Sequence, residues 1–299
     1  MDQIQLGKSD IQITPIIMGT WQAGKQMWTG IDDSDTQRAL RAAFDNGITT
    51  IDTASMYGNG HSERIIARSL GDVRHEVIYA TKVFANQLAR DQVFNACHRS
   101  LRNLSSDYID LYQIHWPAGS FGSREVPVAE TLAAMAELKQ QGKIRAIGVS
   151  NFSCAQLEEA LAVERIDSLQ PPYSLFWRQF ESDAMPLCQK EQITVLAYSP
   201  LAQGILAGKF GPDHQFDKGD HRAKNRLFQP DIYLHVQAAL DRLRPIADEH
   251  GLTLAQLALS GCRKHVGLRD SNPRPGRQFD KASWPRHPCR GTAWHHPAI

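Results

Sequence analysis

Three segments decide the fold: TTIDTASMYG at residues 49–58, VIYATK at residues 77–82, and YIDLYQIH at residues 108–115. Each segment contains a short, mainly apolar run that ends at a charged or ionisable residue. These end residues are Asp52, Lys82 and His115. Residues with helical spacing follow each of them. Strands buried on both faces are nearly continuous apolar runs. The segments therefore predict parallel strands joined by helices.

The same alternation continues along the chain. We expect further strands at residues 15–19, 144–149, 168–170 and 193–198, after a short hairpin at residues 4–13. Helical spacing occurs at residues 33–46, 63–70, 90–104, 129–141, 155–162 and 183–191. Seven strand–helix units without a GxGxxG turn after the first strand favour a closed (β/α)8 TIM barrel over a doubly wound sheet.

Bulk properties restrict the class of protein. A length of 299 residues suits a single α/β barrel. The net charge of +1 gives no reason to expect a nucleic-acid partner. The five scattered cysteines form no CxxC motif, and no apolar run reaches the roughly 18–20 residues of a membrane span. These features predict a soluble cytoplasmic protein with reduced thiols and no membrane segment.

Polar side chains recur at the ends of the predicted strands. They are Asp52, Lys82, His115, Ser150 with Asn151, Gln170, and Tyr198 with Ser199. Any one of them could be a helix cap, a solvated charge or a loop residue. Active sites of parallel barrels lie at the carboxyl ends of the strands, so the recurrence predicts an active site there.

The residue types at these ends predict proton transfer to a carbonyl oxygen. Tyr57 has a phenol whose ordinary pKa near 10 makes it a poor acid at neutral pH. We expect Lys82 to lower that pKa, and Asp52 on the adjacent strand to keep the lysine charged. His115, one strand further, would donate a hydrogen bond to the same oxygen. No side chain can deliver a hydride, so this chemistry requires a nicotinamide cofactor.

Aromatic residues in the loops at the same end of the barrel predict an apolar substrate pocket for a small carbonyl compound. The residues that we expect to line it are Trp21, Trp28, Tyr57, Phe84, His115 and Trp116. Trp28 could equally pack the loops. The sequence does not distinguish aldehydes, ketones, sugars and quinones as substrates.

Several motifs, in order along residues 1–262, together resemble the aldo-keto reductase superfamily. They are Gly19-Thr20-Trp21, Ile51-Asp52-Thr53-Ala54 with Tyr57-Gly58, Thr81-Lys82, Gln113-Ile114-His115-Trp116, Gly148-Val149-Ser150-Asn151-Phe152, Gln170 with Tyr173-Ser174, and Ala197-Tyr198-Ser199-Pro200-Leu201 with Gly204. The similarity is to bacterial general aldo/keto reductases, which are related to the potassium-channel β-subunit branch.

The resemblance implies a catalytic tetrad of Tyr57, Asp52, Lys82 and His115, with Tyr57 as the proton donor. It also implies NADPH (or NADP⁺), bound in an extended form without a Rossmann unit. Ser150, Asn151 and Gln170 would hold the carboxamide, and Tyr198 would stack on the nicotinamide. The full cofactor set that we expect is Gly19, Thr20, Trp21, Asp52, Ser150, Asn151, Gln170, Tyr198, Ser199, Pro200, Leu201, Gln203 and Gly204.

The C-terminal stretch departs from the pattern that the resemblance implies. Residues 263–299 form a basic, proline-rich tail with eight Lys/Arg and two Asp/Glu, in place of strand 8 and the segment that grips the 2′-phosphate. Codons compatible with residues 270–276 read Thr-Ala-Ile-Pro-Gly-Arg after a shift of one base. We therefore expect a frameshifted tail and a disrupted strand 8 and final helix. A naturally divergent tail is the alternative, and sequencing the gene decides between them.

Three functions remain open from the sequence. The first is an NADPH-dependent oxidoreductase that reduces an aldehyde or ketone to an alcohol, with Tyr57 as the proton donor. The second is a non-enzymatic NADPH-binding sensor or channel-associated subunit, because that branch of the superfamily includes such proteins. The third is an inactive product of a gene damaged at its C-terminal end.

Overall fold

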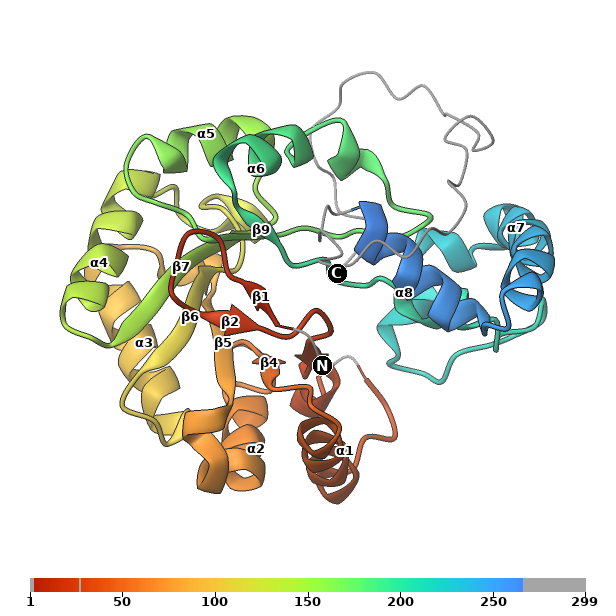
Figure 1. Ribbon diagram of the computed structural model, residues 1–299, viewed down its shortest axis with the longest axis horizontal. Coiled ribbons are helices and arrows are strands. Elements are labelled where there is room, and N and C mark those ends of the chain that lie inside the picture. The colour runs from red at the N-terminus through yellow and green to blue at the C-terminus, as the bar shows by residue number, and fades with distance from the viewer. Residues whose placement is uncertain (1–2, 27, 266–299) are drawn as a thin grey trace.

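Seven parallel strands form one sheet, and their order in space is their order in the chain. We describe them from a computed structural model, which describes residues 3–26 and 28–265. The strands are β3 (Met18–Gly19), β4 (Thr50–Asp52), β5 (Ile78–Val83), β6 (Ile109–Ile114), β7 (Ile144–Ser150), β8 (Ser168–Gln170) and β9 (Thr194–Val195). The sheet curls, with helices around its outside (Figure 1). The predicted (β/α)8 barrel class is confirmed, with seven strands in the described residues.

Six helices cover the outer face of the sheet. They are α1 (Asp33–Asp45), α2 (His61–Leu70), α3 (Arg90–Leu104), α4 (Val128–Gln140), α5 (Cys154–Leu161) and α6 (Met185–Glu191). Local capping explains where two of them begin. The Asp32 carboxylate accepts the backbone N–H groups of Ser34 and Asp35 at the start of α1, and Ser153 forms a capping box with Gln156 at the start of α5.

The predicted hairpin is confirmed and closes the amino-terminal end of the barrel. Strands β1 (Ile4–Gln5) and β2 (Gln12–Ile13) pair antiparallel. Their apolar residues pack against inward-facing side chains of the barrel strands in one cluster, whose buried members are Leu6, Ile11, Ile13, Ala80, Leu111, Ala146 and Leu196. The hairpin thus fills this end, and the carboxyl ends of the strands remain for a site.

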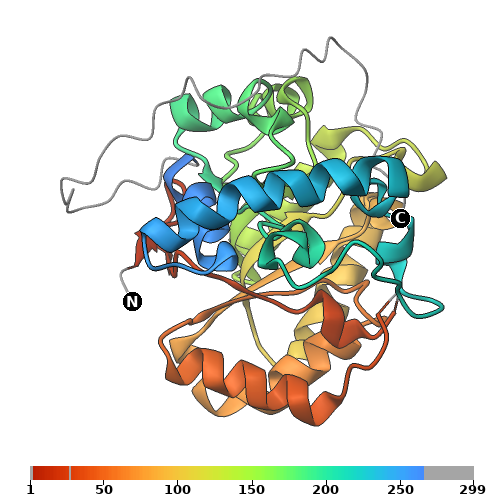
Figure 2. The same cartoon turned by 90° about the vertical axis from the view of Figure 1, so that its right-hand side faces the viewer.

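Helix α7 (Pro230–Glu249) is a feature that we did not predict. It packs on helix α8 (Leu254–His265), which in turn packs on the short helix Ala202–Ala207, and the three share a second apolar core (Figures 1 and 2). Its buried residues are Tyr233, Val236, Leu240, Leu243 and Ala247, a spacing typical of one helix face. That spacing was readable in the sequence.

The C-terminal predictions fall largely outside the described residues. Helix α8 continues to His265, past residue 262 where we expected the barrel part to end. The disrupted strand 8 and the final helix belong to residues 266–299, which the structure does not describe. None of the helices within residues 3–26 and 28–265 is long and apolar enough to cross a membrane.

Candidate active site

Strand register brings the predicted acid–base residues to one end of the barrel. Asp52 is the last residue of β4, and Lys82 lies on β5, the neighbouring strand. Lys82 is in register with Gln113 on β6, and His115 directly follows that strand. These carboxyl ends meet at the edge of the sheet opposite the hairpin.

Lys82 and Asp52 form a buried ion pair. The ammonium Nζ lies 2.7 Å from Asp52 Oδ1 and also donates to the Thr53 carbonyl oxygen at 2.8 Å. The lysine side chain is fully buried, and that of Asp52 is 13% exposed. Burial lowers the pKa of Lys82 below its ordinary value, and the adjacent Asp52 carboxylate opposes this shift.

Two glutamine amides hold the second oxygen of Asp52. Gln170 Nε2 donates to Asp52 Oδ2 at 3.0 Å, and Gln113 Nε2 lies 3.5 Å from the same oxygen. We expected Gln170 to hold the cofactor carboxamide, and in the structure its amide nitrogen contacts the Asp52 carboxylate. Gln113 was absent from our predicted site because it lies within a strand. Together the two amides orient the carboxylate toward Lys82.

The rings of Tyr57 and His115 contact each other next to the Lys82–Asp52 ion pair. Their ring centroids are 5.8 Å apart in an edge-on arrangement, and Lys82 Nζ lies 5.3 Å from the centre of the Tyr57 ring. Burial, followed by the Asp52 charge, raises the pKa of Tyr57 far above its ordinary value. This contradicts the predicted lowering: desolvation of the phenolate and the carboxylate charge both favour the neutral phenol.

His115 is neutral in this environment. Burial, and then the positive charge of Lys82, lower the pKa of the His115 imidazole well below its ordinary value. Its Nδ1 is buried and has no hydrogen-bond partner in the part of the chain that the structure describes. A neutral imidazole keeps one N–H group, which can donate to a substrate oxygen.

Close backbone packing fixes the position of Tyr57. Gly58 has φ +60°, and a methyl group on Gly24 would lie 2.7 Å from the Gly58 nitrogen and 2.7 Å from the Tyr57 carbonyl carbon. Only glycine fits at residue 24 without a backbone shift. The turn after β4 is thereby held against the loop that carries Trp21.

Ser150, Asn151 and Tyr198 form a hydrogen-bonded row across the ends of β7 to β9. Tyr198 Oη donates to Asn151 Oδ1 at 2.9 Å, and Asn151 Nδ2 donates to the His115 carbonyl oxygen at 3.0 Å. Ser150 Oγ donates to the Gln170 carbonyl oxygen at 2.8 Å. Asn151 adopts φ +62°, a left-handed conformation that asparagine tolerates better than most residues. The row ties the predicted nicotinamide-binding residues to His115.

The loop after Tyr198 contains several left-handed backbone conformations. Four of its residues adopt positive φ: Ser199 (+55°), Ala202 (+48°), Gln203 (+57°) and Gly204 (+97°). The Ala202 and Gly204 N–H groups donate to the Ser199 and Leu201 carbonyl oxygens within the loop. Leu201 packs into the second apolar core, and Gln203 Oε1 accepts from Asn225 Nδ2 at 2.6 Å. These two predicted cofactor residues therefore have structural partners within the protein.

The N-terminal residues of the predicted cofactor set support Asp52. Gly19 is in register with Asp52 in the sheet. The Thr20 backbone N–H and hydroxyl both donate to the Asp52 carbonyl oxygen, at 3.0 and 2.9 Å. Trp21 lies beside Tyr57, with ring centroids 6.4 Å apart. The end of strand β3 is thus joined to the backbone of Asp52 at the site.

The predicted aromatic residues form two groups at the mouth of the site. Trp21 and Trp28 contact each other, and both contact His221, whose ring centroid is 4.7 Å from each of theirs. Phe84 lies 5.6 Å from His115 and stacks on Phe121.

Trp116 also contacts Phe121, with ring centroids 5.1 Å apart. Our predicted lining did not include His221 or Phe121. Phe121 is 55% exposed with φ +57°. A second aromatic residue five positions after Trp116, in the same predicted loop, was the signal that the sequence offered.

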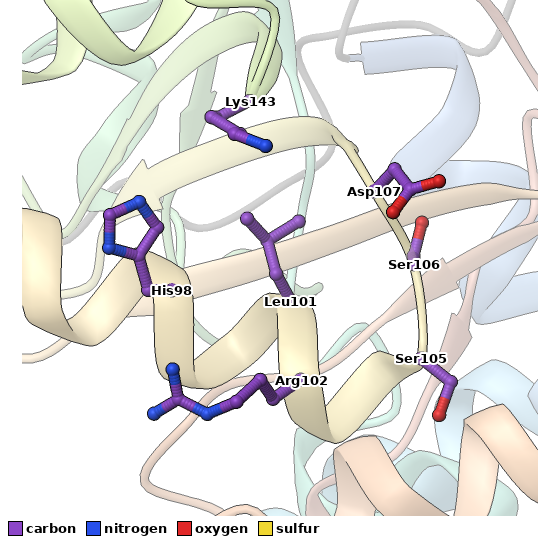
Figure 3. A pocket seen from close by; sticks show the side chains of 7 residues that line it. All are labelled: His98, Leu101, Arg102, Ser105, Ser106, Asp107 and Lys143. Atoms are coloured by element: carbon purple, nitrogen blue, oxygen red, sulfur yellow. The ribbon is translucent and has the colours of Figure 1, made fainter.

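A separate surface cavity of about 400 Å³ lies elsewhere on the barrel (Figure 3). Its lining residues are His98, Leu101, Arg102, Ser105, Ser106, Asp107 and Lys143. Asp107 lies two residues before β6 and Lys143 directly before β7, so this cavity is at the amino-terminal ends of the strands. None of the predicted site residues lines it.

The fold and these contacts define a parallel α/β barrel with a buried lysine–carboxylate pair, a tyrosine and a histidine at the carboxyl ends of its strands. Residues 15–265 match the profile described as the aldo/keto reductase family. The chain therefore belongs to this oxidoreductase family.

Three relatives illustrate the range of similar proteins. The chain is 38% identical to the aldo-keto reductase YhdN of Bacillus subtilis, over 87% of this chain and 80% of that protein. It is 33% identical to an NADH-specific methylglyoxal reductase of Escherichia coli, over 90% and 87%. It is 32% identical to a probable voltage-gated potassium channel subunit beta of Arabidopsis thaliana, over 90% and 85%.

Solved structures share the fold. The glycerol dehydrogenase of Gluconobacter oxydans is similar with a TM-score of 0.80 and 34% identity, over 88% of this chain and 83% of that one. An aldo/keto reductase of Klebsiella pneumoniae, solved in complex with NADP and acetate, has a TM-score of 0.69 and 29% identity, over 87% and 80%.

Proposed function

We propose that this protein is a cytoplasmic NADPH-dependent reductase that converts a small aldehyde or ketone to an alcohol, with Tyr57 as the proton donor. The observation that carries the proposal is the Lys82–Asp52 pair, buried beside the rings of Tyr57 and His115. The named activity of the E. coli relative on methylglyoxal supports a small carbonyl substrate.

Tyr57 can act as the proton donor although burial raises its pKa. At neutral pH the phenol carries its proton because burial disfavours the phenolate. The alkoxide formed by carbonyl reduction has a basicity comparable to hydroxide (pKa of water about 16), so it takes the proton once charge develops on the oxygen. The Lys82 ammonium beside the ring then stabilises the phenolate that remains.

Binding of the cofactor would use the hydrogen-bonded row of Ser150, Asn151 and Tyr198 and the loop that follows Tyr198. Ser150, Asn151 and Tyr198 would hold the nicotinamide end, and the backbone of residues 199–204 would hold the pyrophosphate. When bound, NADPH supplies the hydride. His115, neutral and next to Tyr57, would orient the carbonyl oxygen by a hydrogen bond.

Titration of NADPH and of NADH, followed by nucleotide fluorescence, tests the proposal together with a reduction assay on methylglyoxal and a panel of aldehydes and ketones. We expect saturable binding and carbonyl-dependent oxidation, with NADPH preferred. Binding without turnover of any carbonyl would replace the proposal with a cofactor-binding channel-associated subunit. Failure to bind either nucleotide would indicate a damaged product.

The packing of Gly24 on the Tyr57 turn gives a prediction that does not alter a reacting group. Gly24→Ala should reduce kcat/KM about 100-fold, because the added methyl group displaces the backbone of Tyr57 and Gly58. Steady-state kinetics on a test aldehyde measures this. Gly71→Ala is the control: its methyl group meets no atom within 4 Å and its φ is −64°. Equal kcat/KM in both variants would contradict the prediction.

A further inference from the structure

Trp28 carries a buried polar atom that the proposed mechanism does not use. Its indole Nε1 is buried and has no hydrogen-bond acceptor among the residues that the structure describes. An indole N–H group can only donate, and in a buried tryptophan it usually has an acceptor. A buried donor without one destabilises the fold. A ligand that supplies the acceptor would remove this cost.

Contacts on several sides hold the Trp28 ring in one orientation. The Trp21 ring meets it edge-on, with 5.5 Å between the centroids, and the His221 ring centroid lies 4.7 Å away. The Arg222 guanidinium lies over its face, with Cζ 4.8 Å from the ring centre. Rotation of the indole toward solvent would break these contacts. The fold therefore keeps the N–H group buried.

Arg222, which covers the Trp28 ring, is itself fixed by a buried carboxylate. Its Nε donates to Asp220 Oδ1 at 3.0 Å and its Nη2 to Asp220 Oδ2 at 2.6 Å, and the Asp220 side chain is 2% exposed. The Phe216 ring packs on the same guanidinium, 4.8 Å from Cζ. The position of the Trp28 ring is thus set before any ligand binds, which lowers the cost of binding.

The Trp28 ring belongs to the aromatic group next to the proposed proton donor. Trp21 contacts both Trp28 and Tyr57, and its ring centroid lies 6.4 Å from that of Tyr57. The other aromatic group at the mouth, which includes Phe84, contacts His115 instead. A ligand that extends from Tyr57 along the Trp21 ring therefore reaches Trp28.

Packing accounts for the Trp28 ring but not for its N–H group. The edge-on contact with Trp21 and the cation–π contact with Arg222 are made by the aromatic ring system. Neither contact uses the indole N–H as a hydrogen-bond donor. Because buried polar groups in folded proteins are paired, an oxygen of a bound molecule is the partner that this place in the site favours.

We propose that Trp28 is a specificity-determining residue, whose indole N–H donates to a second oxygen of the carbonyl substrate, a hydroxyl or another carbonyl. The inference rests on the proposed reductase function, because it names the carbonyl compounds that such a reductase prefers. A substrate without the second oxygen leaves the buried N–H group unpaired, and a site discriminates against such a substrate.

The kinetic test compares glyceraldehyde with propionaldehyde, which has the same carbon chain without hydroxyl groups. Trp28→Phe keeps an aromatic ring and removes the N–H group. It should lower the ratio of the two kcat/KM values, glyceraldehyde over propionaldehyde, about tenfold relative to wild type. The intrinsic reactivities of the two aldehydes cancel in this comparison. An equal ratio in Trp28→Phe and wild type would overturn the proposal.

Phe84→Leu is the matched control for this ratio. Phe84 belongs to the other aromatic group, with its ring centroid 5.6 Å from that of His115, and its side chain has no polar atom. The variant should change kcat/KM for both aldehydes by similar factors, so that their ratio stays within about twofold of wild type. A tenfold fall of the ratio in Phe84→Leu as well would indicate a general distortion of the pocket and would contradict a role of the N–H group.

A binding measurement separates this proposal from the reductase function. In protein labelled with isotopic tryptophan, the Trp28 indole N–H signal in the NMR spectrum is the one missing from Trp28→Phe, or from Trp28→Tyr if the first variant folds poorly. Titration with glycerol, in the presence and in the absence of NADP⁺, should shift this signal, and 1-propanol should shift it much less. This result would support the site even if the protein reduces no carbonyl compound.

Two results of the titration would overturn the proposal. Equal responses of the Trp28 signal to glycerol and 1-propanol, or no response to either, would mean that the N–H group does not recognise a second oxygen. A shift on addition of NADP⁺ that glycerol leaves unchanged would assign the N–H group to the cofactor.

Discussion

Tyr57→Phe should lower kcat by about 10³-fold while cofactor binding stays within about twofold of wild type. The substitution removes only the hydroxyl that carries the transferred proton. The ring keeps its contacts with Trp21 and His115 and its place near the Lys82 ammonium. Single-turnover reduction and a parallel fluorescence titration of NADPH measure the two effects separately.

Tyr198→Phe is the matched control for this prediction. Its hydroxyl donates to Asn151, within the proposed nicotinamide-binding row. Loss of that bond should weaken cofactor binding, with hydride transfer at saturating cofactor falling less than about tenfold. If Tyr57→Phe retained a tenth or more of wild-type kcat, another group would have to donate the proton.

The second large effect is on stability. Asp110→Ala should destabilise the fold by about 3–5 kcal/mol, because it leaves the guanidinium of Arg74, which is 14% exposed, without its buried partner. The Asp110 carboxylate is 1% exposed and accepts from Arg74 at 2.8 Å, from Arg145 at 2.7 Å and from the Tyr79 backbone N–H at 2.9 Å. Urea unfolding at pH 7 measures the change.

The packing of Arg74 makes this loss difficult to relieve. Its guanidinium lies between two rings, 4.2 Å from the centre of Tyr79 and 4.1 Å from that of Tyr108. It also donates to the backbone carbonyls of Val77 and Tyr108. The group is thus fixed in place and cannot turn to solvent when Asp110 is removed.

The exposed neighbour Asp107 provides the control for Asp110. Asp107→Ala should change the free energy of unfolding by no more than about 0.5 kcal/mol. Folded Asp110→Ala protein should keep the wild-type kcat, because Asp110 lies near the start of β6 and His115 follows its end. A decrease in the free energy of unfolding of less than about 1 kcal/mol for Asp110→Ala would contradict the prediction. It would mean that solvent screens the charges of Asp110, Arg74 and Arg145.

Much of the architecture was predictable because local spacing specifies it. All six outer helices have bounds within two residues of those expected, and α3 matches at both ends. The hydrophobic period and the caps are local properties, so they can be read without the rest of the chain. Helix α7 was also predictable, because its buried residues have a regular helical spacing in the sequence, and we overlooked it.

The composition of the site was less predictable than its position. Gln113 contacts Asp52 from within strand β6. The sequence alone does not show whether a glutamine in a strand faces the site or packs against a helix. His221 reaches Trp21 and Trp28 from far along the chain. Such contacts depend on loop paths that no local pattern encodes.

The sequence by itself determined the barrel class, because apolar runs and the 3.6-residue period of the helices are local properties. Its motifs, in their order along the chain, indicated the family. Only the tertiary structure decided the electrostatics of the acid–base groups. The pKa of Tyr57 rises where we expected it to fall, and the Gln170 amide contacts Asp52. The physical reason is desolvation: the energy of a charge depends on every group that excludes water from it, and those groups come from all parts of the chain.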